Sequence, residues 1–85
     1  MSIREDSKKI IRHFLSKAIE CGNLVASFPL EYSELTRELN LESENYCRVC
    51  CNYLTGKRYI AIRFRFDKPE TITLDAQAID FLESA

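Results

Sequence analysis

Three of the chain's four cysteines lie within five positions, in the stretch YCRVCCNYL at residues 46–54. Cysteine thiolates bind zinc, and the spacing of Cys47 and Cys50 is that of redox-active dithiols. A structural zinc site needs four ligands, but the remaining candidates, Cys21 and His13, fall on another predicted helix. A redox dithiol sits at the N-terminus of a helix that follows a strand, where the helix dipole lowers the thiol pKa. The role of the cysteines therefore depends on the element that carries them.

A helix is predicted over residues 44–55, with Ser43 as a good N-cap and an end near Gly56. Four apolar side chains within it are spaced i, i+3, i+4 and i+7, which is the buried stripe of an amphipathic helix. These four are Cys47, Cys50, Cys51 and Leu54. Free cysteine packs as a small hydrophobic residue. We therefore predict that the cysteines are core residues and that the protein uses no metal and no cofactor.

The chain has 85 residues, of which 46% are hydrophobic and 29% charged, and this suits a single domain over residues 1–85. No apolar run approaches the roughly 20 residues that span a membrane, and the charged start MSIREDSKKIIRHF does not resemble a signal peptide. We therefore expect a cytoplasmic protein with no membrane partner and with reduced cysteines. We do not expect an enzyme, because the sequence shows no nucleophile–base pair, paired carboxylates or glycine-rich phosphate loop.

Apolar residues recur every three or four positions over residues 2–21, which predicts a first helix that ends at Gly22. Residues 23–30 are short, apolar and closed by a proline, so we expect an edge strand or an extended connector. A short helix is expected to begin near Tyr32 and to break at Asn40.

The hydrophobic period changes to two in YIAIRFRF, residues 59–66, which predicts a strand. The inward face of this strand is expected to carry Ile60, Ile62, Phe64 and Phe66. DKPE, residues 67–70, is expected to form a turn. TITL, residues 71–74, then returns as the second strand of a hairpin, with Ile72 and Leu74 inward. The final stretch, DAQAIDFLESA, is predicted to be a short helix.

The order of these elements and part of their sequence resemble the winged helix-turn-helix superfamily. YSELTRELNLESENYCRVCCNYLTGKRYIAI looks like the helix-turn-helix and first wing strand of bacterial and phage members. ITLDAQAIDFLES looks like their ending, in which a wing strand runs into a helix and a glycine often stands at the position of Ala78. The resemblance covers residues 32–83, and the first helix matches by pattern. It implies an α+β fold with a three-helix core, a C-terminal β-hairpin wing and a terminal helix.

Winged helices bind DNA, RNA or other proteins, so function depends on the surface. The net charge is −1, but residues 47–68 carry six basic groups and one acidic group. In a DNA-binding member, the third helix would enter the major groove and present Asn45, Arg48, Val49 and Asn52 to the bases. Phosphate contacts would come from Lys57, Arg58, Arg63, Arg65 and Lys68. We therefore expect a regulator of transcription, of bacterial or phage type, that binds double-stranded DNA.

An alternative class is a winged-helix adaptor that binds another protein and not DNA, such as a phage-encoded modulator of a host complex. A polar outer face is ordinary for a soluble helix, and Arg63 and Arg65 also suit the solvated side of a half-buried hairpin. The helix that begins near Tyr32 carries three acids that would repel phosphate. These are Glu31, Glu34 and Glu38.

A homodimer is predicted through the final helix. Ile79 and Leu82 suffice to cover the small core, and Phe81 lies about 100° from Leu82 on the helical wheel. Phe81 adjoins Ala78, which is small enough to let a second helix approach closely. We therefore predict that Ala78 and Phe81 form the dimer interface, with a monomer that exposes a single Phe as the alternative.

Overall fold

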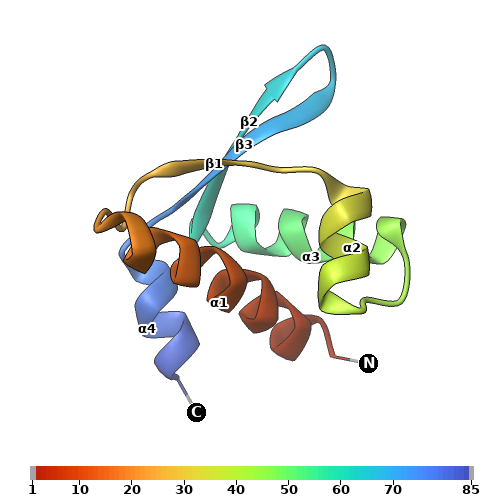
Figure 1. Cartoon of the computed structure of the whole chain (residues 1–85). Helices are drawn as coiled ribbons and strands as arrows, with labels where there is room; N and C mark the ends of the chain where they lie inside the picture. Colours follow the sequence, from red (N-terminus) through yellow and green to blue (C-terminus); the bar gives the residue numbers. More distant parts are fainter. Residues whose placement is uncertain (1, 85) are drawn as a thin grey trace.

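The computed structural model describes residues 2–84, which form four helices and a three-stranded antiparallel sheet (Figure 1). The elements are α1 (Ile3–Cys21), β1 (Ser27–Pro29), α2 (Tyr32–Leu39), α3 (Glu44–Gly56), β2 (Ile60–Arg65), β3 (Lys68–Leu74) and α4 (Gln77–Glu83). The strand order in the sheet is β1-β3-β2. The predicted α+β class is confirmed, and the layout is compatible with a winged helix. Within the described chain, no helix combines the length and the apolar character needed to cross a membrane.

The predicted boundaries of α1, α2 and α3 are confirmed, and capping contacts explain them, whereas α4 is shorter than the predicted stretch of residues 75–85, of which Ala85 lies outside the described residues. Ser2 caps α1, because its hydroxyl accepts a hydrogen bond from the Glu5 backbone N–H, and Gly22 ends the helix with a φ of 70°. Asn40 ends α2 with a φ of 53°, which asparagine tolerates better than most residues. The Ser43 hydroxyl accepts from the Tyr46 N–H at 3.0 Å and starts α3. These caps satisfy backbone groups that helix ends leave unpaired.

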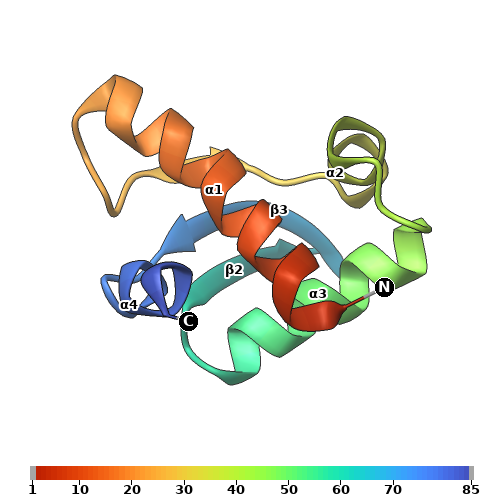
Figure 2. The ribbon, with the colours of Figure 1, turned by 90° about the horizontal axis from the view of Figure 1, so that it is seen from below.

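The cysteine stripe of α3 forms the centre of the core, where α1 crosses over α3 (Figure 2). Cys47, Cys50 and Cys51 are all 0% exposed and are free thiols, so the prediction of core packing is confirmed. Burial raises the pKa of the Cys50 thiol, which keeps it protonated. Of the two other candidate ligands, Cys21 is exposed and His13 faces Glu38, with Nε2 and Oε2 3.2 Å apart. No group of three or more His, Cys, Asp or Glu residues within residues 2–84 could hold a metal ion.

The sheet has a buried base and a projecting end. Strand β1 pairs with β3 as the predicted edge strand, and the base of the hairpin buries Ile60, Ile72 and Leu74 as predicted. Beyond the base, β2 and β3 continue together away from the helices (Figure 1). We call this projecting part, residues 63–70, the wing.

The predicted burial of the strand's far end is wrong. Phe64 is 55% exposed and Phe66 is 86% exposed, because the wing extends past the helices that cover the base. The turn also lies earlier than predicted. It consists of Phe66 and Asp67, both with positive φ, and β3 begins at Lys68 within the stretch predicted as the turn.

The predicted dimer contact of Ala78 and Phe81 is wrong. Ala78 is 0% exposed and Phe81 is 4% exposed within the single chain. The Phe81 ring stacks on Tyr59, with ring centroids 4.6 Å apart, so α4 turns this side chain toward the core. Ile79 and Leu82, which were predicted to cover the core, are only half-buried. The two residues predicted to form the homodimer interface are therefore buried within one chain and cannot form it.

Candidate nucleic-acid interface

The face of α3 opposite the cysteine stripe is open to solvent. It presents the four residues predicted to read bases, and all four are exposed: Asn45, Arg48, Val49 and Asn52. This placement follows from helical geometry, because burying the cysteine stripe on one side leaves the polar stripe on the other. Val49, which is 46% exposed, is the apolar member of this face. The four side chains offer hydrogen-bonding groups and one apolar contact on a rigid helix.

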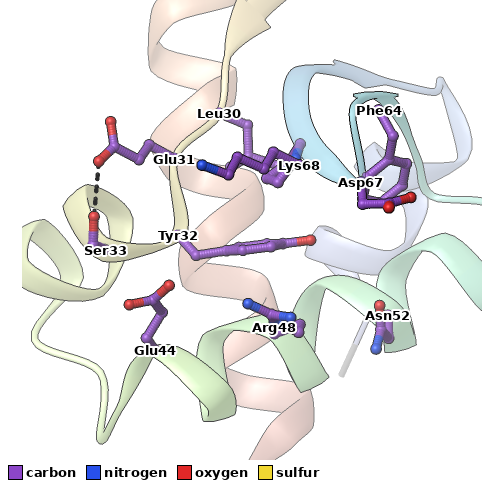
Figure 3. Close-up of a pocket in the computed structure, with 11 residues that line it drawn as sticks. Leu30, Glu31, Tyr32, Ser33, Glu44, Arg48, Asn52, Phe64, Asp67 and Lys68 are labelled. Carbon is purple, nitrogen blue, oxygen red and sulfur yellow. Dashed lines mark hydrogen bonds between the residues drawn. The ribbon is translucent and has the colours of Figure 1, made fainter.

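A groove runs between α3, the start of α2 and the wing, with a volume of about 530 Å³ (Figure 3). Arg48 and Asn52 enter it from α3, and Lys68 enters it from the wing. Its other lining residues are Leu30, Glu31, Tyr32, Ser33, Glu44, Phe64, Asp67 and Pro69. The structure thus brings three of the predicted DNA-binding residues together from two elements.

Arg48 is held in the groove by an aromatic ring. Its guanidinium lies over the ring of Tyr32, 5.1 Å from the centroid, and Figure 3 shows the two side chains side by side. Tyr32 is 6% exposed and is fixed by the core at the start of α2, so it provides a rigid platform. A guanidinium stacked by its face keeps N–H groups in its plane for hydrogen bonds to an acceptor. Tyr32 was predicted only as the start of a short helix, so this contact was not expected from the sequence.

The groove carries mixed charge. Arg48 and Lys68 are its cations, and Glu31, Glu44 and Asp67 are its acids. The Ser33 hydroxyl donates to Glu31 at 2.9 Å, which keeps this carboxylate at the rim. Three acids beside two cations do not favour phosphate inside the groove. A polyanion would therefore meet the exposed face of α3 and the wing in preference to the floor of the groove.

The remaining predicted phosphate contacts do not gather around the groove. Lys57 lies over the Tyr53 ring, 6.0 Å from its centroid, on the side of α3 that faces α4. Arg58 lines a shallow hollow with Ala61 on the outer face of the sheet. Arg63 shares that outer face, because side chains two positions apart in a strand point the same way. The nine residues are all exposed, but they divide between two faces of the molecule.

Two aromatic side chains on the wing were not predicted as site residues. Phe64 lines the groove opposite Arg48, and Phe66 stands at the tip of the hairpin next to Arg65. Their alternation with arginines predicted one buried face, but the register of the hairpin shifts between Arg63 and Phe64, and Phe66 lies in the turn beyond the end of β2. A comparison of the chain with models of protein families, with curated proteins and with solved structures finds no match.

Proposed function

We infer that the chain is a winged-helix domain that binds double-stranded DNA and regulates transcription in a bacterial or phage setting. The observation that carries this inference is that the exposed face of α3, with Arg48 and Asn52, lies beside the wing, with Lys68, so that the helix and the hairpin present one surface outside the groove. The topology supports it, since α2 and α3 pack together and the hairpin follows directly, with the strand order β1-β3-β2. A helix and a hairpin that share one surface can engage neighbouring grooves of a duplex.

In this proposal α3 lies in the major groove and reads bases. Arg48 suits guanine, Asn45 or Asn52 suits adenine, and Val49 suits the methyl group of thymine. The stack on Tyr32 orients the Arg48 guanidinium before binding, which reduces the conformational entropy lost on contact. The outward face of α3 has no acid at its centre, and Glu44 lies at its edge in the first turn.

The wing supplies phosphate contacts that are independent of sequence. Arg65 and Lys68 are paired across the end of the hairpin, so both reach the same part of a duplex. Binding through about four phosphates gives a log–log salt slope of roughly −4. The acids of the groove and the net charge of −1 weaken long-range attraction, so we expect moderate affinity that falls steeply with salt.

The test is selection of duplexes from a random-sequence pool, followed by binding measurements over a range of salt concentrations. Arg48→Ala should lose about 1–3 kcal/mol of discrimination at one base pair. Lys68→Ala should weaken all duplexes alike and flatten the salt slope by about one unit. Lys17→Ala is the matched control, because Lys17 is exposed on α1 beside His13, away from α3 and the wing, and should change neither quantity.

The alternative function, a protein-binding adaptor, is favoured by one observation. The groove combines the half-exposed Phe64 ring with three carboxylates, which suits a basic and apolar protein segment better than phosphate. The selection experiment separates the two functions. If no duplex is enriched and none binds at low salt, DNA binding is rejected in favour of the adaptor.

A further inference from the structure

The tip of the wing is a tight turn that contains an aromatic residue, which is an unfavourable residue type for such a turn. Strands β2 and β3 pair as far as Arg65 and Lys68, so the turn contains only Phe66 and Asp67. Their φ angles are 51° and 62°, in the left-handed region. Asparagine, aspartate and glycine are the usual residues of such turns, and a bulky aromatic residue there costs free energy. Asp67 fits this turn, whereas Phe66 does not.

The Phe66 ring gains no compensating burial. It is 86% exposed, the highest value among the exposed large hydrophobic side chains of residues 2–84. The register of the hairpin shifts between Arg63 and Phe64, and such irregularities bend and twist a strand and redirect its end. A strained backbone that presents a bare aromatic ring on a projecting hairpin weakens the folded state. Contact with another molecule would give the exposed ring a role that the folded chain alone does not give it.

The charges around the ring indicate the chemistry of that molecule. The Arg65 guanidinium lies 5.5 Å from the centroid of the Phe66 ring, and Lys68 pairs with Arg65 across the strands. An apolar protein pocket that received the ring would have to remove both cations from water. A nucleic-acid duplex offers phosphates for the cations and the faces of base pairs for the ring. The wing also carries two acids, Asp67 in the turn and Glu70 farther along β3, against the three cations Arg63, Arg65 and Lys68.

We propose that Phe66 is a wedge that inserts between two stacked base pairs from the minor groove and kinks the duplex. The proposal rests on DNA binding by α3 and the wing, and it adds a deformation of the DNA that α3 alone would not produce. An inserted apolar side chain partly unstacks one step and bends the duplex toward the major groove. Flexible pyrimidine–purine steps cost least to open, so they are the expected targets. The tip would thus add sequence preference without hydrogen bonds to bases.

The experiment uses the full chain and a duplex enriched by the wild type from a random-sequence pool. 2-Aminopurine is placed at each pyrimidine–purine step in turn, because its fluorescence rises when it is unstacked. Dyes at the two ends of the duplex report the bend. Phe66→Asn removes the ring and suits a positive φ, so the hairpin keeps its turn. Phe66→Leu is the matched control, because it keeps an apolar wedge.

The wild type should raise the fluorescence at one step and shorten the distance between the ends. Phe66→Asn should abolish both signals and bind about 10-fold more weakly, whereas Phe66→Leu should keep most of the bend. The wedge is overturned if the wild type binds without unstacking any step, or if Phe66→Asn gives the same signals as the wild type. In either case DNA binding itself stands. If no duplex is bound, the proposed function fails and the wedge fails with it.

Discussion

The two ends of the β2–β3 hairpin have the same alternating sequence pattern and opposite environments. At the base, Ile60 and Ile72 are 4% and 0% exposed, while Phe64 and Phe66 on the wing are 55% and 86% exposed. The base is covered by helices, with Tyr59 stacked on Phe81 of α4 and the α3 core beneath it. The wing has no such cover. An alternating pattern predicts which side chains share a face only while the register is regular, and neighbouring elements decide whether that face is buried.

The largest effect should come from comparing the loss of a phenylalanine ring on α4, which covers the base of the hairpin, with the loss of one at the wing tip. Phe81→Ala should lower the free energy of unfolding by about 3–5 kcal/mol, because it leaves a cavity beside Tyr59. Phe66→Ala should change it by less than about 0.5 kcal/mol, because the ring is already in water. Urea unfolding of the two variants measures the contrast. Equal losses would mean that the wing tip is packed against the rest of the protein.

A second comparison is between a buried cysteine and an exposed one. Cys51 is 0% exposed in α3 and Cys21 is exposed at the end of α1. Cys51→Ser should lower the free energy of unfolding by about 1–3 kcal/mol, because it buries a hydroxyl among apolar side chains. Cys21→Ser is the matched control and should be close to neutral. Thermal unfolding under reducing conditions would show the difference, and a neutral Cys51→Ser would contradict a tightly packed stripe.

A smaller change in the free energy of unfolding is expected from a partly buried hydrogen bond between α1 and α3, and it should depend on pH. The Tyr46 hydroxyl on α3 donates to the Asp6 carboxylate on α1 at 2.5 Å, and this bond lowers the pKa of Asp6. A lowered pKa stabilises the fold above the unfolded value, near 4, and the stabilisation is lost as pH falls through the folded value. Tyr46→Phe should therefore cost about 1 kcal/mol near neutral pH and less in acid. Urea unfolding at neutral and at acid pH measures this difference. If Tyr46→Phe lowers the free energy of unfolding equally at both pH values, the loss comes from packing and not from the hydrogen bond to Asp6.

Most of the fold was predictable because local signals agreed with one another. Ser43, Gly22 and Asn40 mark helix ends by their own chemistry, and the cysteine spacing identifies the buried stripe of α3. The errors occurred where a distant element decides the outcome. Phe81 is buried because Tyr59 lies against it, and the groove exists because Tyr32 and the wing flank α3. The spacing of residues along the chain does not predict contacts between elements that are distant in sequence.

The smallest expected effect concerns the backbone at the tip. Phe66 has a φ of 51°, which an aromatic residue adopts at a cost, so Phe66→Asn should raise the free energy of unfolding by about 0.5–1 kcal/mol. Phe64→Asn is the matched control on the same hairpin. Phe64 lies in β2, where asparagine is unfavourable, and this variant should be neutral or destabilising. Urea unfolding of the two variants gives the comparison. If Phe66→Asn lowers the free energy of unfolding, the Phe66 ring supports the turn. If it raises the free energy of unfolding, the exposed ring destabilises the fold, as expected of a residue retained for contact with a partner.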